Sequence, residues 1–112
     1  VLAQATKDHS FVQFLIDNGT ISPSQAENHP NKNLILRALG VNESIEADTY
    51  FIDDCVAVLL CSDGLTNCVS DEDIRRILRR KTSGEEKLRE LIDAANNGGG
   101  ADNITAVLYL PD

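Results

Sequence analysis

The chain has 112 residues, 42% of them hydrophobic and 25% charged, with a formal net charge of −8. These values are ordinary for one small globular domain, and no apolar run in the sequence is long enough to cross a bilayer. The negative charge argues against nucleic acid or an anionic membrane surface as a partner, and we expect a cytoplasmic protein.

The first forty residues predict a strand end and short helices. Alternating apolar residues over 1–6 are typical of the end of a strand. Ser10 and Ser22 each stand three residues before a glutamine, a capping-box pattern that predicts helices beginning at residues 11 and 23. Apolar residues at helical spacing over 33–39 predict a third short helix.

Two strands are predicted next. Residues 45–52 alternate between apolar and polar, and Asp53 and Asp54 form a turn into the apolar run 55–61, so we expect an antiparallel pair. Because the second run shows no alternation, we expect it to be covered on both faces. The cysteines, at positions 55, 61 and 68, form no Cys-x-x-Cys pair, which indicates free thiols rather than a disulfide framework or a structural zinc site.

The last third predicts two helices and a strand. Ser70 and Ser83 are expected to cap amphipathic helices that end near residues 80 and 95, and the strand occupies 104–110. The fold class is therefore α+β, an antiparallel sheet packed with helices. The first of these helices carries four arginines: Arg75, Arg76, Arg79 and Arg80. Arginines in this pattern ordinarily form a solvated helix face, and the alternative is that they bind a phosphate or an acidic partner.

Two acids are the candidates for chemistry. Asp63 directly follows the predicted strand 55–61, and Asp102 directly precedes the strand 104–110. If these strands are antiparallel neighbours, the two carboxylates lie at the same end of the sheet and offer the oxygen ligands that Mg²⁺ or Mn²⁺ prefers. The alternative is that Asp63 supports its turn or caps the next element, and that the two are unrelated turn aspartates.

The motifs around these acids resemble a known family. Ser62-Asp63-Gly64-Leu65 follows an apolar strand, and Gly-Gly-x-Asp-Asn-Ile-Thr, with Asp102 and Asn103, precedes another. Upstream stand Thr-Lys-Asp-His-Ser at residues 6–10 and Ile-Ser-Pro-x-x-Ala-x-x-His-Pro-x-x-Asn at 21–33. Together these are similar to the C-terminal half of bacterial-type, metal-dependent protein Ser/Thr phosphatases of type 2C (the PPM family).

The resemblance implies a function for the complete domain. It implies part of an α-β-β-α sandwich that hydrolyses phosphoserine and phosphothreonine on protein substrates in signalling, through a water activated by a dinuclear Mg²⁺ or Mn²⁺ centre. Asp63 and Asp102 would be metal ligands, and Gly64 and Asn103 would shape the turns around them. A flap subdomain would occupy about residues 10–40, with these motif positions: Ser22, Pro23, Ala26, His29, Pro30 and Asn33.

Other motifs of that family are missing from the chain. It contains no Asp-Gly-His-Gly, no Glu-Asp motif ahead of it and no early phosphate-binding Arg, and it begins at Val1 without a single Met. We therefore expect 1–112 to be the C-terminal part of one phosphatase domain, holding metal weakly or not at all and inactive by itself. His9 and His29 are expected to be ordinary polar residues at helix boundaries.

Two alternatives belong to other functional classes. One is a non-catalytic interaction module, which would self-associate through exposed sheet faces or edges. The other is a phosphoacceptor regulatory domain, against which the lack of regular strand-helix alternation argues.

Overall fold

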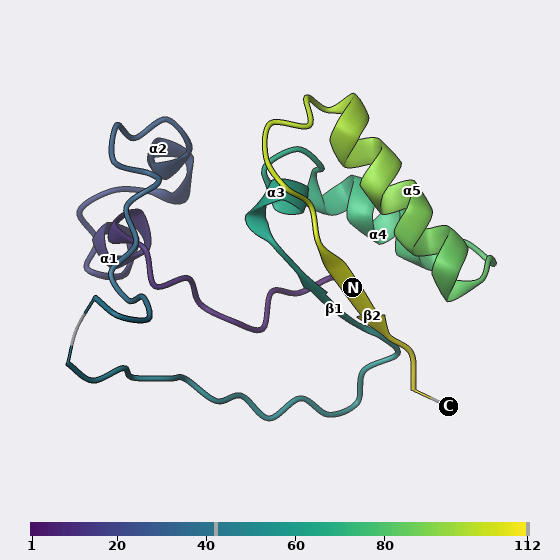
Figure 1. Ribbon diagram of the computed structural model, residues 1–112, viewed down its shortest axis with the longest axis horizontal. Helices are drawn as coiled ribbons and strands as arrows, with labels where there is room; N and C mark the ends of the chain where they lie inside the picture. Colours follow the sequence, from purple (N-terminus) through teal and green to yellow (C-terminus); the bar gives the residue numbers. More distant parts are fainter. Residues whose placement is uncertain (42, 112) are drawn as a thin grey trace. The chain divides into compact units, whose positions relative to one another are not determined.

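The computed structural model describes residues 1–41 and 43–111, and the chain forms two compact units. Unit 2 is Gln4–Phe51 and contains the helices α1 (Phe11–Asp17) and α2 (Pro23–Glu27). Unit 1 comprises Val1–Ala3 and the chain from Ile52 onward. Its elements, drawn in Figure 1, are β1 (Val58–Cys61), α3 (Asp63–Thr66), α4 (Asp71–Arg79), α5 (Gly84–Asn97) and β2 (Ala106–Tyr109).

Unit 1 is built around one hydrophobic core. Leu65 of α3 and Leu91 of α5 are fully buried, and the other buried members come from α4, α5 and the segment between α3 and α4: Val69, Ile74, Ile77 and Ala95. Leu59 of β1 and Ala106 of β2 pack against this cluster. The amphipathic pattern of the two long helices therefore places their apolar residues in this core, and Figure 1 shows the helices on one side of the two strands.

The sheet has two antiparallel strands, β1 and β2. The register pairs Leu59 with Leu108 and Cys61 with Ala106, and directly opposite residues share a face. One face, formed by these four residues, lies toward the helices, while the other carries Val58, Leu60, Val107 and Tyr109. Leu60 is 60% exposed and Tyr109 is also 60% exposed, so the second face is open in the part of the chain that the structure describes.

This sheet corrects two of our expectations. The strand 55–61 was expected to be covered on both faces, but only Val58–Cys61 is a strand and helices cover one face. The expected pair of 45–52 with 55–61 is also wrong, because β1 takes β2 as its partner and 45–52 forms no strand. A strand needs a neighbour for its backbone groups, and alternation alone does not identify that neighbour.

The helix starts follow the predicted caps. The hydroxyl oxygens of Ser10, Ser22, Ser70 and Ser83 each accept the backbone N–H three residues on. At Ser22 the box is complete, because the Gln25 side chain also accepts the Ser22 N–H at 2.8 Å. Local capping chemistry therefore fixed these helix starts.

The helix predicted over 33–39 is wrong. Its backbone pairs with the segment before α1 instead: Phe11 N–H donates to the Leu34 carbonyl at 3.1 Å, and Leu36 N–H donates to the His9 carbonyl at 2.7 Å. These bonds surround an isolated antiparallel bridge between Ser10 and Ile35. Extended pairing satisfies the backbone groups that a helix would use, and its apolar side chains stay exposed, Ile35 to 70%.

The strand end expected over 1–6 is likewise absent, since these residues have no regular structure. Too few alternating residues stand there to favour a ladder over an irregular course. Among the described residues, no helix is long and apolar enough to span a membrane.

Candidate metal centre

The register brings the two candidate acids to one end of the sheet. Asp63 begins α3 two residues after Cys61, and Asp102 lies four residues before Ala106, the partner of Cys61. Both side chains are exposed. Asp63 therefore opens a short helix, which the sequence did not predict, and a negative charge in a first turn is favourable there. Asp63 and Asp102 therefore lie at the same end of the sheet, as the sequence predicted for antiparallel strands.

Ser62 holds the two segments together, and sequence reasoning missed it. Its Oγ donates to the Asn103 carbonyl at 3.2 Å and accepts the Thr105 N–H at 3.0 Å. Its backbone N–H donates to the Thr105 carbonyl at 2.9 Å. The sequence signal that could have identified Ser62 is its position: a hydroxyl side chain that directly follows one strand and so can bond to the segment before the neighbouring strand. These three bonds fix the residues next to Asp63 against those next to Asp102.

Gly64 permits this close approach. A Cβ built on Gly64 would lie 2.1 Å from the Asn103 carbonyl oxygen and 2.9 Å from the Asn103 carbonyl carbon. Both are backbone atoms, so no side-chain rotation relieves the contact. Asn103 itself donates its backbone N–H to Asp102 Oδ1 at 2.7 Å, which orients that carboxylate and leaves its second oxygen available.

The donor set fits a hard divalent cation only in part. Two exposed carboxylates at one sheet end suit Mg²⁺ or Mn²⁺, which take oxygen ligands and keep several waters. Among residues 1–41 and 43–111, however, no group of three or more His, Cys, Asp or Glu side chains is positioned to hold a metal ion. The three cysteines are free thiols, as expected.

The expected flap residues lie in and around α2. Ser22 caps the helix, Pro23 occupies its first turn, and Ala26 is its one buried residue. The His29 ring lies 6.0 Å from that of Phe11, and its Nδ1 accepts the Asn31 N–H at 3.0 Å. Pro30 and Asn33 are exposed in the turns that follow α2.

A second polar cluster ties unit 2 together. His9 Nε2 lies 2.7 Å from Asp48 Oδ2, and an Arg37 guanidinium nitrogen lies 3.2 Å from Asp48 Oδ1. Tyr50 adds its hydroxyl at 3.4 Å from Asp48 Oδ2, and Arg37 also lies 3.8 Å from a Glu46 carboxylate oxygen. The hydrogen bond from His9, and then the one from Arg37, lowers the pKa of the Asp48 carboxyl below its ordinary value.

This cluster makes unit 2 sensitive to acid. A carboxyl with a lowered pKa contributes stability above its unfolded pKa, about 3.9, and that contribution is lost as the pH falls through the folded pKa. In a carbon-13 titration we expect the Asp48 carboxyl to have a midpoint below the ordinary aspartate pKa. His9→Asn should raise the Asp48 midpoint; an unchanged midpoint would contradict the assigned cause.

The chain is similar, in sequence and in structure, to several named bacterial phosphatases. It is 47% identical over 114 residues to the serine/threonine phosphatase stp of Listeria monocytogenes, covering 100% of this chain and 45% of that protein. The structure of Stp1 from Staphylococcus aureus superposes with a TM-score of 0.91 at 33% identity, over 98% of this chain and 44% of that one. The structure of the catalytic domain of PstP in complex with two manganese ions superposes with a TM-score of 0.79 at 41% identity. The match covers 96% of this chain and 44% of that one.

These matches confirm the predicted fold class and the family resemblance. No family model matches the chain. The chain spans somewhat under half the length of the relatives it matches. Over its length the chain is therefore similar, in sequence and in fold, to somewhat under half of bacterial Ser/Thr phosphatases of the PPM (type 2C) kind.

Proposed function

We propose that the chain supplies two ligands, Asp63 and Asp102, to the Mg²⁺ or Mn²⁺ centre of a phosphatase that hydrolyses phosphoserine and phosphothreonine on proteins. The single observation that carries this proposal is the antiparallel register of β1 and β2, which puts both acids at one end of the sheet. The manganese ions in the PstP structure support a metal centre in a relative that shares this fold.

The chain's own residues would contribute by holding the metal ions and by fixing where the metal ligands lie. Asp63 and Asp102 would hold the cations, and Ser62 and Gly64 keep the two carboxylate-bearing segments in contact. When bound, the metal ions supply an activated water and neutralise charge on the phosphoryl oxygens. Residues of unit 2 from about 10 to 40 would form the flap that influences which phosphoprotein segment enters. We place this chemistry in the cytoplasm.

Two carboxylates alone should bind metal weakly, because the charge that retains a second cation is small. For the 112 residues we expect Mn²⁺ affinity on the order of millimolar and little or no phosphopeptide turnover. Binding can be followed by Mn²⁺-induced broadening of backbone amide signals. We expect the broadening to centre on Gly64 and Asn103 and to be lost in Asp63→Asn and in Asp102→Asn.

The matched control is Asp93→Asn, which removes an exposed acid from α5 with the same change of charge. This variant should keep the wild-type broadening. Broadening that persists in Asp63→Asn, or that centres elsewhere, would contradict the proposed ligands. Efficient Mn²⁺-dependent turnover by the 112 residues, abolished by Asp63→Asn, would show instead that the chain carries a complete centre.

A second candidate function is an interaction module that self-associates. The open face of the sheet favours it, because Leu60, Val107 and Tyr109 are each at least 55% exposed. Molecular mass by light scattering, measured as a function of concentration, tests this function. A constant monomer mass up to millimolar concentration would exclude it.

A further inference from the structure

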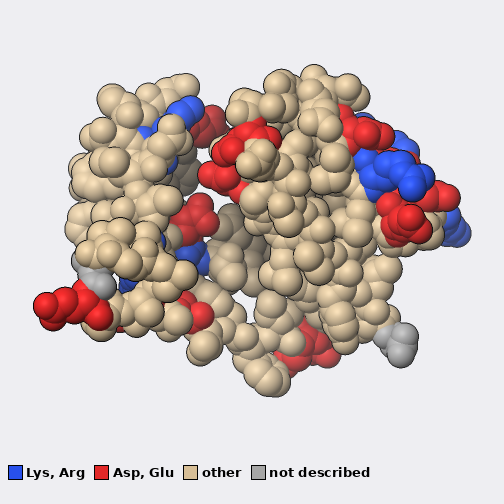
Figure 2. Space-filling view, in the orientation of Figure 1, with Lys and Arg blue, Asp and Glu red and all other residues tan. Residues whose placement is uncertain are grey.

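The basic residues of the chain are concentrated on one part of unit 1. Of the ten Lys and Arg residues, seven lie between positions 75 and 89, where only two acids stand: Arg75, Arg76, Arg79, Arg80, Lys81, Lys87 and Arg89, with Glu85 and Glu86. In Figure 2 blue side chains gather over this hairpin of α4 and α5. Over the whole hairpin, residues 71–97, seven acids balance these seven basic residues, so what matters is which arginines have acidic partners.

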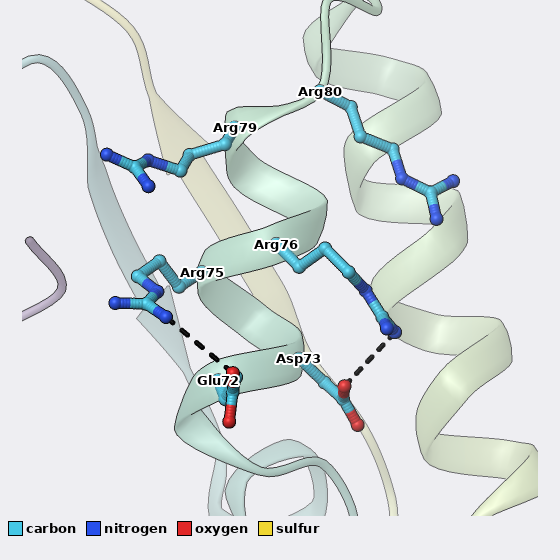
Figure 3. A pocket seen from close by; sticks show the side chains of 6 residues that line it. All are labelled: Glu72, Asp73, Arg75, Arg76, Arg79 and Arg80. Carbon is cyan, nitrogen blue, oxygen red and sulfur yellow. Dashed lines mark ion pairs between the residues drawn. The ribbon is translucent and has the colours of Figure 1, made fainter.

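The structure separates the four α4 arginines into two edges. Figure 3 shows Arg76 and Arg80 pointing toward α5, and Arg75 and Arg79 pointing to the opposite side of α4. On the α5 side both charges are compensated, because Arg76 lies 3.1 Å from Asp73 and Arg80 lies 2.9 Å from Glu90. These close pairs occupy the guanidinium groups of that edge.

The other edge is not compensated in this way. Arg75 makes only a 3.8 Å contact with Glu72, whose side chain is 83% exposed. Within residues 1–41 and 43–111, Arg79 takes part in no ion pair. Arg75 and Arg79 stand one helical turn apart, so their like charges repel each other unless an anion lies between them. We call this pair the free arginine edge.

The connection from α4 to α5 reaches the end of β2 that is remote from Asp102. Arg79 ends α4, and Gly84, which begins α5, lies against the end of β2: a Cβ on Gly84 would be 3.1 Å from the Leu110 side chain. Asp102 precedes the opposite end of β2. An anion bound at this edge would therefore be held by residues other than Asp63 and Asp102.

We propose that the free arginine edge is a docking site for a phosphorylated side chain on a partner protein. Two adjacent guanidinium forks match the several oxygens of a phosphoryl dianion and bind it by charge-assisted hydrogen bonds. A long polyanion such as nucleic acid fits less well, because the positive surface is short and the acidic remainder of the chain repels it. This docking site does not depend on the metal ligands proposed above.

The test is a nuclear magnetic resonance titration of the 112-residue chain in the presence of EDTA, which prevents metal-dependent hydrolysis. The probe is a short Gly-Ser peptide carrying one phosphoserine, and its unphosphorylated form is the reference. We expect Arg75 and Arg79 signals to shift with the phosphopeptide only. Arg75→Gln with Arg79→Gln should weaken binding by about tenfold or more.

The compensated edge provides the matched control, with the same change of charge on the same helix. Arg76→Gln with Arg80→Gln should change the affinity by less than about twofold, since exposed ion pairs contribute little to stability and both variants should fold. Equal weakening by both double variants would overturn the proposal in favour of unspecific attraction. It would also be overturned if no Arg75 or Arg79 signal shifts.

Discussion

Leu91→Ala is expected to lower the free energy of unfolding of unit 1 by about 2–5 kcal/mol, the range for deleting a large buried aliphatic side chain. Leu91 has no exposed surface and lies in the core cluster that joins α3, α4 and α5. A cavity at this point weakens the packing between α5 and the rest of this cluster. Urea denaturation followed by circular dichroism at 222 nm measures the change, because α4 and α5 supply most of the helical signal.

Leu60→Ala is the control, because it deletes the same atoms from a side chain that is 60% exposed. We expect it to cost less than about 1 kcal/mol, since little apolar surface is returned to water. Equal costs for Leu60→Ala and Leu91→Ala would contradict the assignment of the core. In that case the open sheet face would have to be covered in solution, as self-association requires.

Gly64→Ala is expected to have the second large effect. The added Cβ would meet the Asn103 carbonyl at 2.1 Å, so the backbone beside Asp63 or beside Asp102 must move. Overpacking of this kind costs about 1–3 kcal/mol, and here it also separates the two carboxylate-bearing segments. Hydrogen exchange at the Thr105 amide, which donates to Ser62 Oγ, measures the loss directly.

Gly84→Ala is the comparison for Gly64→Ala. The nearest atom to its added Cβ is the end of the flexible Leu110 side chain at 3.1 Å, and alanine is a better helix former than glycine. We expect little change in stability and none in exchange at Thr105. Faster exchange at Thr105 in Gly84→Ala but not in Gly64→Ala would refute the role given to Gly64.

Local signals predicted most of unit 1 correctly. Serine caps located the starts of α4 and α5, and β-branched and apolar residues located both strands of the sheet. The positions of Asp63 and Asp102 at one sheet end also followed, because antiparallel pairing of their strands requires it. The motifs also predicted the resemblance to bacterial Ser/Thr phosphatases, which the similar proteins confirmed.

The failures share a physical cause, which is competition for backbone partners. Residues 33–39 have helical spacing, but the carbonyl of Leu34 and the N–H of Leu36 pair with the segment around Ser10. Residues 45–52 alternate like a strand, yet Asp48 and Tyr50 instead join the cluster around His9 and Arg37. Both outcomes depend on contacts between distant segments, which composition and periodicity do not encode. Ser62 was missed for the same reason.

The buried residues of the unit 1 core lie within residues 59–106, and so do the partly buried residues that pack against them. Of the residues of unit 2 that the structure describes, 4–41 and 43–51, none belongs to it. In evolutionary terms, insertions and deletions in unit 2 leave every contact of this core in place, whereas similar changes in α3, α4 or α5 remove some of them. The segment that would face the substrate is thus the one whose length can vary at the lowest cost to the scaffold that carries Asp63 and Asp102.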